Sequence, residues 1–565
     1  MILSFGSVII SILSFVFALG LIILVHEGGH FLFARRANIL CREYAFGMGP
    51  QLWKKKKGET VYSIRAFPIG GFCAIAGEET EDDPLSRIKE VRLLIENGKV
   101  VKIILDDNND LYKDVKKYTV VEYDLFDAKD TGNLYIKVLG EAEEVIELPV
   151  DPKAMYVVTK AVKNPNYTKE QKISKYTQEV QIAPHNRTLN AKSKRARAMV
   201  MFGGPLMNFL LAIVVFFIGG LITGFADTSS TKLGDIDKDA PAYVAGLRDG
   251  DIILELSTTD TDGKIISSGE LKDWNDLTGF MDTYKQNEKC MGEITVKYLS
   301  DDQEKTTTVT PMVVIYSISM LQDMEDLTSV KIGELSPQSL AYKGGLREGD
   351  IILGIKYANE DNTNLVSIAS WKQVYNVFAN NINGDKMTIS VLREGEAVAC
   401  TVDPYSKELF DKTQNVEISE ILMGVSPKTK FSFGKSVVYS FTELGGSLVD
   451  MVHTLEMLFF SSEVGVGQLS GPVGIFSMTS NAAKGGFGNL LLWIGFLSVN
   501  VGFLNLLPIP ALDGGRLVFV AYEAITRKKP SEKVETILIS VTMILLLGLI
   551  VFVSFNDILR LLGVK

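Results

Sequence analysis

The chain has 565 residues, 46% of them hydrophobic and 22% charged, so it exceeds one ordinary domain and combines apolar with polar regions. Its net charge of −10 argues against binding to nucleic acid, which favours a basic surface. The four cysteines form no CxxC pair, so the sequence indicates neither a disulfide framework nor a thiolate zinc site.

Four uncharged segments are each long enough to cross a hydrocarbon core of about 30 Å as a helix. They are residues 1–25, 199–226, 485–512 and 536–556. The first lacks the basic start and the small-residue exit of a cleaved signal peptide, so we expect it to be retained. We therefore predict a polytopic α-helical membrane protein with about four transmembrane helices, at 1–35, 191–226, 485–516 and 533–562.

The basic residues beside these spans predict the orientation of the chain. One cluster follows span one and contains Arg35, Arg36, Arg42 and Lys54–Lys57. A second precedes span two and contains Lys192, Lys194, Arg195 and Arg197. The third lies between spans three and four, at Arg527–Lys529. With four spans all three clusters lie on one side, which the excess of Lys and Arg makes cytoplasmic. The region between spans two and three, roughly 227–484, is then extracytoplasmic.

His26-Glu27-Gly28-Gly29-His30, at the end of the first span, is an H-E-x-x-H motif. Positions i and i+4 lie on one face of a helix, so both imidazoles can bind one ion. Neutral imidazole suits zinc, and Glu27 can take a proton from water held by that ion. Placing ionisable side chains within a transmembrane span costs free energy, so they are expected to have a function. The alternative, that the two imidazoles only cap the end of a helix, explains the motif poorly.

The segment 84–190 is predicted to form a small β-rich module on the cytoplasmic side. Asn97-Gly98, a strong hairpin signal, separates two strand-like runs, and three further runs follow at 118–126, 134–139 and 144–150. We assign this insertion no function.

The outer region contains an internal repeat. Gly246-Leu-Arg-Asp-Gly-Asp-Ile-Ile-Leu254 recurs 99 residues later as Gly345-Leu-Arg-Glu-Gly-Asp-Ile-Ile-Leu353, so we expect two copies of one α+β domain, at 229–315 and 325–405. The pattern resembles PDZ domains, which bind an extended peptide at a sheet edge. Asp235 and Glu334 would repel a peptide carboxylate in such a groove. Two roles therefore stay open for the pair: peptide capture, or a steric filter or spacer.

Residues 431–462 carry apolar side chains at helical spacing. We expect an amphipathic helix on the outer membrane surface. A fifth span here would break the charge pattern that sets the orientation.

A zinc site needs at least a third protein ligand. His185 lies in the basic cytoplasmic stretch and His453 in the outer amphipathic segment. Asp513 closes span three at the predicted depth of the H-E-x-x-H motif, after Pro508 and Pro510, which prevent a regular helix. It is the best candidate for the third ligand, the alternative being an ordinary Asp-Gly turn.

Together these features resemble the bacterial site-2-protease family. The resemblance rests on H-E-x-x-H in span one, PDZ repeats after span two, and Asn505-Leu-Leu-Pro-Ile-Pro-Ala-Leu-Asp513-Gly in span three. It implies a Zn²⁺ protease of the bacterial cell membrane that cuts within the helices of single-span proteins, such as anti-sigma factors or signal-peptide remnants. It also implies His26, His30 and Asp513 as metal ligands and Glu27 as the catalytic base.

Other residues gain roles only through this resemblance. Three residues match the positions at which the family is thought to receive the unwound substrate: Asn500, Asn505 and Pro508. Gly70, Gly71 and Phe72, in the region 36–83, belong to a segment similar to the family's membrane-dipping β-hairpin. Gly203–Asn208 matches a small-residue motif where helices pack closely. The insertion at 84–190 is longer than the family pattern.

Two other functions account for part of these features. A metal or proton transporter could use the two histidines and Asp513 as a relay, yet it needs neither Glu27 nor two peptide-binding modules. An inactive membrane scaffold could present the PDZ pair, but a structural metal site has no use for a base. The expected partners are single-span membrane substrates, the lipid bilayer and peptide ligands of the PDZ pair, with no nucleic acid.

Overall fold

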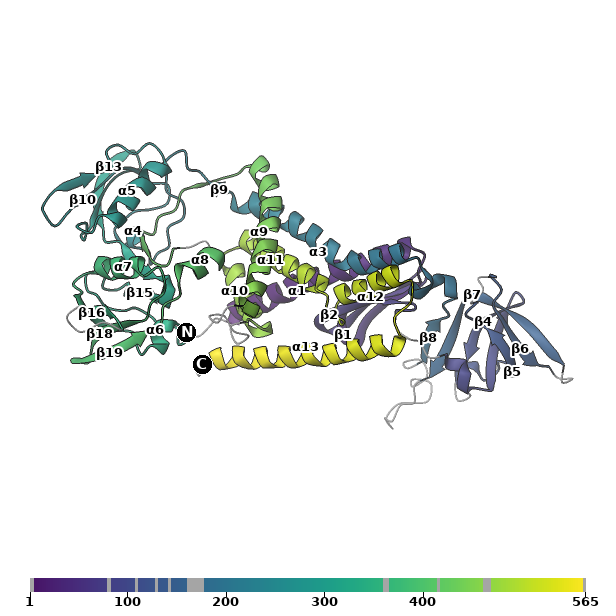
Figure 1. Ribbon diagram of the computed structural model, residues 1–565. Helices are drawn as coiled ribbons and strands as arrows, with labels where there is room; N and C mark the ends of the chain where they lie inside the picture. Colours follow the sequence, from purple (N-terminus) through teal and green to yellow (C-terminus); the bar gives the residue numbers. More distant parts are fainter. Residues whose placement is uncertain are drawn as a thin grey trace. The chain divides into compact units, whose positions relative to one another are not determined.

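The computed structural model describes residues 5–78, 83–106, 110–127, 131–140, 144–159, 177–358, 365–413, 417–460 and 469–561. The chain divides into two compact units, one of Met1–Val214 with Trp493–Leu546 and one of Val215–Leu492 with Leu547–Lys565. Figure 1 labels many of the helices and strands of both units.

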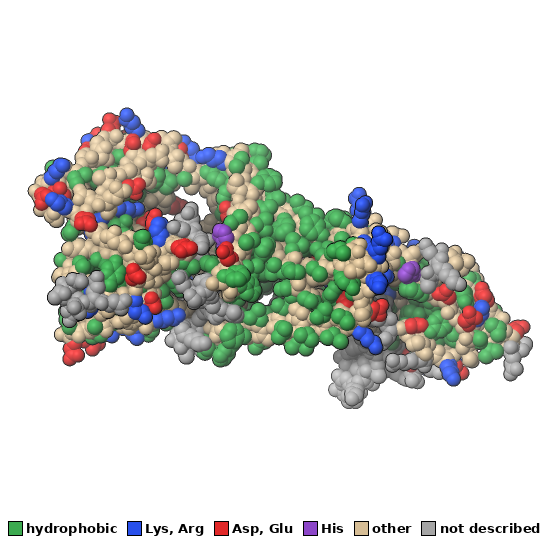
Figure 2. All heavy atoms as spheres, viewed as in Figure 1, with side chains coloured by type: hydrophobic (Ala, Val, Ile, Leu, Met, Phe, Trp, Pro, Cys, Tyr) green, Lys and Arg blue, Asp and Glu red, His purple; other side chains and the backbone are tan. Residues whose placement is uncertain are grey.

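Four helices have the length and apolar composition needed to cross a membrane, as the sequence predicted. They are α1 (Phe5–Arg36), α3 (Lys194–Thr223), α11 (Phe487–Leu506) and α13 (Glu532–Leu561). Large apolar side chains of α13, among them Ile544, Leu545 and Val551, are exposed, and Figure 2 shows hydrophobic side chains covering these helices. Such a surface suits lipid tails rather than water.

A long antiparallel hairpin, β1 (Cys41–Lys57) and β2 (Thr60–Ile75), follows α1. Gly47 and Gly49 adopt positive φ values of 85° and 86° where the register shifts, so the hairpin bends there. The hydroxyl of Tyr44 donates to the Leu24 carbonyl at 2.6 Å. A Cβ added to Gly71 would lie 2.9 Å from the Ile23 side chain, so the hairpin packs directly on α1.

The insertion is β-rich, in agreement with the sequence. A six-stranded sheet contains β3 (Glu90–Glu96), β4 (Lys99–Ile104), β5 (Lys117–Asp124), β6 (Tyr135–Leu139), β7 (Val145–Thr159) and β8 (Thr177–Gln181). Asn97 and Gly98 form the β3–β4 turn with positive φ at both residues. Strand β4 also pairs with β7, which closes the sheet around a core that includes Leu93, Val100 and Ile136.

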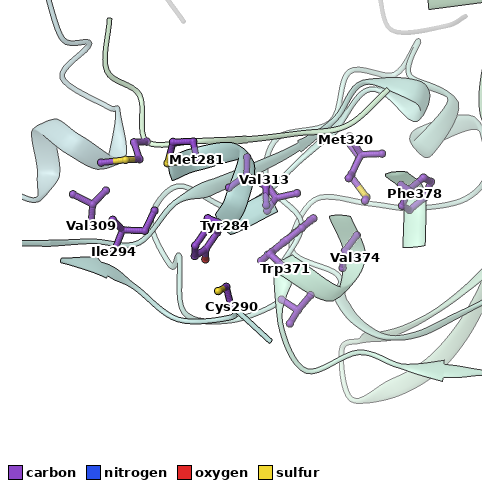
Figure 3. Close-up of a cluster of buried hydrophobic side chains, with 14 of the residues drawn as sticks. Met281, Tyr284, Cys290, Ile294, Val309, Val313, Met320, Trp371, Val374 and Phe378 are labelled. Carbon is purple, nitrogen blue, oxygen red and sulfur yellow. The ribbon is translucent and has the colours of Figure 1, made fainter. Parts of the chain in front are cut away.

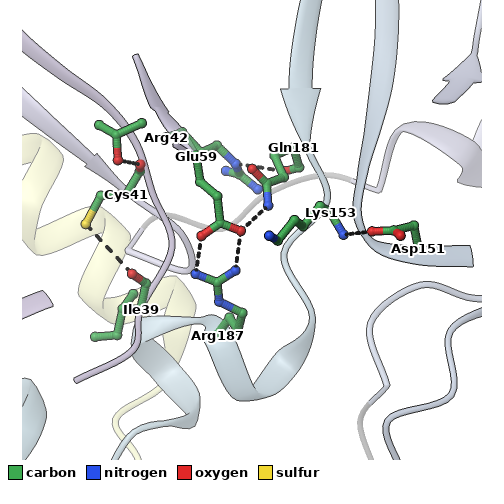
Figure 4. A network of polar contacts seen from close by, with 9 residues as sticks. Ile39, Cys41, Arg42, Glu59, Asp151, Lys153, Gln181 and Arg187 are labelled. Atoms are coloured by element: carbon green, nitrogen blue, oxygen red, sulfur yellow. Dashed lines mark hydrogen bonds and ion pairs between the residues drawn. The ribbon is translucent and has the colours of Figure 1, made fainter. Parts of the chain in front are cut away.

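A half-buried ion pair joins the tip of the β1–β2 hairpin to the end of the insertion (Figure 4). Arg187, in the 3-10 turn His185–Arg187, donates to both Glu59 oxygens at 2.7 and 2.8 Å. Gln181 donates to the same carboxylate at 2.9 Å, and Arg42 donates to the Gln181 carbonyl at 3.0 Å. The bonds from Arg187 lower the pKa of Glu59 to about 2.

The two repeats have the same arrangement of helices and strands. The first module contains α4 (Pro241–Val244), β10 (Ile252–Thr259), β11 (Ile265–Ser267), α5 (Trp274–Gln286), β12 (Ile294–Ser300) and β13 (Gln303–Val309). The second contains α6 (Leu340–Lys343), β16 (Ile351–Tyr357), β17 (Val366–Ser367), α7 (Trp371–Asn380), β18 (Met387–Arg393) and β19 (Glu396–Val402). Both sheets share one strand order, β11-β10-β12-β13 and β17-β16-β18-β19.

The repeated G-L-x-x-G-D motif forms the same turn in both modules. Gly246 and Gly345 share a φ of 100°, which only glycine adopts without strain. The carboxylate of Asp251 accepts the backbone N–H of Arg248 at 2.8 Å, and Asp350 accepts that of Arg347 at the same distance. The sequence repeat is therefore a repeat of backbone geometry.

Segments outside the predicted domain boundaries pair with the first module, which includes β14. A three-stranded sheet has β14 (Met312–Ile315) between β15 (Met320–Leu321) and β20 (Glu420–Leu422). The chain after β20 then pairs with the first module, through Gly234 N–H to Ser426 carbonyl and Lys428 N–H to Lys232 carbonyl, both 2.9 Å. β21 (Thr429–Lys430) continues this pairing to β9 (Phe225–Ala226). The first module thus includes chain that follows the second.

One hydrophobic core runs through both modules (Figure 3). It joins Tyr284 and Cys290 of the first to Trp371 and Val374 of the second. Lys372, only 4% exposed, donates from its ammonium to the carbonyls of Tyr284, at 3.0 Å, and of Lys285 near the end of α5. The two modules therefore pack against each other as one body and are not independent domains joined by a linker.

The remaining helices are α8 (Lys407–Thr413), α9 (Phe433–Phe460), α10 (Pro472–Lys484) and α12 (Asp513–Thr526). α9 covers the segment predicted to be amphipathic, and its placement on the membrane surface stays a prediction. Asp557 of α13 accepts the N–H groups of Gly471 and Gly474 at 2.8 and 2.9 Å, which caps the start of α10.

Candidate metal centre

Two imidazoles and one carboxylate converge near the end of α1. His26 Nε2 lies 3.2 Å from His30 Nε2, and Asp513 Oδ2 lies 3.2 Å from the former and 3.3 Å from the latter. The i, i+4 spacing places both rings on one face of the helix. Asp513 is the first residue of α12, so the structure brings together the three side chains that the sequence predicted to be ligands.

The chemistry of this cluster fits a zinc ion. His30 Nδ1–H donates to the Val200 carbonyl at 2.8 Å, so its Nε2 presents a lone pair to the cluster. Asp513 Oδ2 is buried and has no hydrogen-bond partner among the described residues. Lone pairs that meet within 4.8 Å repel one another unless a cation lies between them.

The turn before α12 positions the carboxylate. Pro508 and Pro510 lie in a short non-helical segment between α11 and α12, as the sequence predicted. A Cβ on Gly514 would overlap the Leu506 carbonyl, and one on Gly515 would overlap the Ile509 carbonyl. The two glycines after Asp513 therefore permit a turn too tight for any side chain.

Helix α3 packs closely against the face of α1 that carries His26 and His30. A Cβ on Gly203 would lie 2.9 Å from the Gly29 carbonyl, and one on Gly204 would overlap the His30 imidazole. This agrees with the close packing expected for Gly203–Asn208. The same helix also supplies Asn208, whose Nδ2 lies 3.1 Å from His26 Nδ1. The sequence analysis missed that role, although a polar side chain in an apolar span is itself a signal.

Glu27 lies between strand β2 and the cluster of His26, His30 and Asp513. Its half-buried carboxylate interacts electrostatically with all three of these side chains. A Cβ on Gly71 would lie 3.5 Å from Glu27 Cγ, so the strand passes beside this side chain. The hairpin thus packs against the side chain that the sequence predicted as the base.

An ion pair lies close to the centre, and no motif predicted it. Arg516, one turn after Asp513, donates to Glu78 at 2.5 Å. Burial raises the pKa of the Glu78 carboxyl. The pair ties the chain after β2 to the start of α12.

The residues assigned to substrate by resemblance lie on the same unit as the metal cluster. Asn500 and Asn505 are in the second half of α11, and Pro508 follows its end. Asn500 Oδ1 is buried without a hydrogen-bond partner among the described residues. Gly70, Gly71 and Phe72 are in β2, where the Arg65 guanidinium lies 4.8 Å from the Phe72 ring centre. Their roles toward a substrate remain predictions.

Comparison with known proteins gives a consistent result along the whole chain. The model of a family described as Peptidase family M50 matches residues 14–549. The chain is 30% identical over 554 residues to the zinc metalloprotease RasP of Oceanobacillus iheyensis, covering 98% of this chain and 99% of that protein. It is 29% identical to RasP of Geobacillus kaustophilus, covering 97% of each. A putative zinc metalloprotease of Staphylococcus aureus, SA1105, is 27% identical over 98% of this chain and 99% of its own length.

Proposed function

The chain belongs to peptidase family M50, and from this membership we propose that it cleaves transmembrane segments of single-span membrane proteins. The chain is a multi-pass membrane protein and a zinc-dependent metalloendopeptidase of the site-2-protease type. That activity sets aside both the transporter and the inactive scaffold that the sequence left open.

We propose that His26, His30 and Asp513 hold the zinc ion. The supporting observation is the convergence of His26 Nε2, His30 Nε2 and Asp513 Oδ2 within 3.2–3.3 Å of one another. Zinc bound there would lower the pKa of water and polarise the carbonyl to be cut. Three protein ligands leave one coordination position open for that chemistry.

Glu27 is the proposed general base. It follows His26 directly on α1, and its carboxylate interacts electrostatically with the proposed ligands. In this position it can accept the proton of the attacking water and pass it to the leaving amine. Strand β2 passes beside the Glu27 side chain and limits the space open to it, which keeps its oxygens near the reacting atoms.

The substrate must be extended before it can be cut, because a helical carbonyl is bonded within its own helix. Strand β2 passes beside Glu27, and Asn500 offers a buried carbonyl oxygen without a partner. We propose that the edge near Gly70, Gly71 and Phe72 and the amides of Asn500 and Asn505 bind the unwound backbone, with Pro508 shaping the turn. Anti-sigma factors and signal-peptide remnants belong to this class of substrate.

The tandem modules are PDZ-like in sequence, and we propose that they lie outside the cytoplasm as a spacer or steric filter. β14 pairs on one side with β15 and on the other with β20, so these strand edges are already occupied. A peptide ligand would need a different edge or would have to displace β14.

The test is cleavage in a cell that co-expresses single-span reporter proteins. The wild type should produce fragments that end within the reporter's apolar segment, mapped by mass spectrometry. Glu27→Gln keeps size and polarity but cannot accept the proton, so it should bind zinc stoichiometrically and produce no fragment. Activity of this variant within a few-fold of wild type would remove the proposed mechanism.

A further inference from the structure

Asn208 is a polar side chain in the middle of the apolar helix α3. It is fully buried, at 0% exposure, and its Oδ1 has no hydrogen-bond partner among the described residues. Its Nδ2 lies 3.1 Å from His26 Nδ1, and its backbone carbonyl accepts the Ser498 hydroxyl at 2.8 Å. A buried amide with an unpaired oxygen inside a span is costly, so a specific role is expected.

The direction of the contact follows from the tautomer of His26. Because Nε2 of His26 faces Asp513 and His30, a metal there requires the Nε2 lone pair, and the ring proton must then lie on Nδ1. An Nδ1–H group cannot accept from the Asn208 NH₂ group. Turning the amide by 180° exchanges two groups of nearly equal shape and points the unpaired Oδ1 at that proton.

We infer that Asn208 is a positioning residue of the metal centre, whose side-chain oxygen accepts the Nδ1 proton of His26 and so directs Nε2 toward the ion. His30 has the equivalent arrangement, because its Nδ1–H donates to the Val200 carbonyl. Both acceptors belong to α3. This helix therefore orients both imidazoles without contributing a ligand. The inference rests on the proposed ligand set.

Zinc affinity of the purified full-length protein, measured by competition with a chelator, tests this role. Asn208→Leu keeps the volume and removes the acceptor, so zinc should bind about 10–100-fold more weakly. Asn208→Asp cannot donate but accepts more strongly, so its affinity should stay within a few-fold of wild type or increase. If the amide acted as a donor, Asp would lose as much affinity as Leu, and if it only filled space, neither variant would lose affinity. Either result would make the inference wrong.

Ser498→Ala is the matched control. It removes the bond to the backbone of the same residue and disturbs the same contact between α3 and α11, yet it leaves the amide in place. We expect unchanged zinc affinity, and a loss equal to that of Asn208→Leu would assign the effect to helix packing. If Asn208→Leu does not fold, the comparison of Asn208→Asp with wild type still decides between acceptor and donor.

His26→Ala separates this inference from the proposed function. Retention of wild-type zinc affinity by His26→Ala would overturn the ligand assignment and the role of Asn208 together. Loss of zinc in His26→Ala with wild-type affinity in Asn208→Leu would overturn the role of Asn208 alone. Loss in both variants with retention in Asn208→Asp supports it.

Discussion

One carboxylate from the distant end of the chain completes the proposed set of zinc ligands. Asp513→Ala should leave two histidines, weaken zinc binding by more than about 100-fold and abolish cleavage. Asp513→Asn should weaken zinc binding and reduce cleavage nearly as much as Asp513→Ala, because a neutral amide is a poor zinc ligand. Metal analysis of the purified variants, together with fragment mapping of a co-expressed reporter, checks both expectations.

The two variants should leave the tandem modules folded, since these modules belong to the other compact unit. Their unchanged protease resistance is the control for global unfolding. Stoichiometric zinc and normal cleavage in Asp513→Ala would show that another residue is the ligand.

Single residues were predictable where the chemistry depends on local spacing. The motif around His26 and His30 uses only the helical repeat, and Asp513 marked the end of an uncharged run. Asn208 and the Glu78–Arg516 pair were not predictable as site residues, because their roles depend on which helices and turns pack together. A single sequence carries no direct record of such partners.

At the scale of elements, the Glu59–Arg187 ion pair should hold the β1–β2 hairpin on the insertion. The folded pKa of Glu59, about 2, is below its unfolded value of roughly 4.3. The stabilisation is therefore fully present above the unfolded pKa and is lost as the pH falls toward the folded one. Glu59→Gln should cost about 1.5–3 kcal/mol at pH 7 and about half of that near pH 3.

Hydrogen exchange of the peptide covering residues 177–187 measures this effect, as the ratio of variant to wild-type rates at each pH. Glu90→Gln breaks the more exposed pair with Lys117, 2.7 Å apart, and should change stability by less than about 0.5 kcal/mol. Equal ratios for Glu59→Gln at pH 7 and pH 3 would contradict the assigned role of the ion pair.

The buried ammonium of Lys372 should fix the two modules to each other. It lies 5.4 Å from the Tyr284 ring centre and 4.8 Å from that of Tyr375, and it donates to the two carbonyls near the end of α5. Lys372→Met keeps the length but leaves those carbonyls unpaired, at a cost of about 1–3 kcal/mol. Faster hydrogen exchange of α5 would be the measured result.

Lys386→Met is the matched control for that change, because Lys386 makes an exposed ion pair with Asp403 at 3.4 Å. Exchange of α5 should be unaffected by it. Equal effects of the two variants would mean that the buried ammonium does not hold the modules together.

Elements with strong local patterns were predicted well. The four apolar helices, the Asn97-Gly98 hairpin and the repeat of the modules all depend on composition, turn residues or internal similarity. The pairing of β14 with β20 was not predicted, because it joins segments more than 100 residues apart. Hydrophobic alternation identifies a strand but not its partner.

For the whole molecule, the basic clusters predict the side of the membrane on which each segment lies. In a background without the four native cysteines, Thr259→Cys in the first module should react with a membrane-impermeant maleimide on intact cells. Lys56→Cys in the β1–β2 hairpin should react only after the cells are lysed. Both positions are exposed in the structure, so burial does not explain a difference.

The reverse labelling pattern would overturn the orientation and leave the metal centre unaffected. Labelling of both positions on intact cells would instead indicate a leaky membrane, which a cytoplasmic marker protein detects. Loss of labelling at Lys56→Cys after lysis would point to a blocked site.

The strand that follows the second module imposes an order on biosynthesis. After the ribosome has made β13, it must add residues 310–419 before β20 and the segment that pairs with Lys232 and Gly234 exist. At about 5–20 residues per second, the segment around Lys232 and Gly234 waits for roughly 5–20 s with one edge unpaired. An open edge of that kind is a template for aggregation. The nascent first module is therefore the stage at which a chaperone would be needed most.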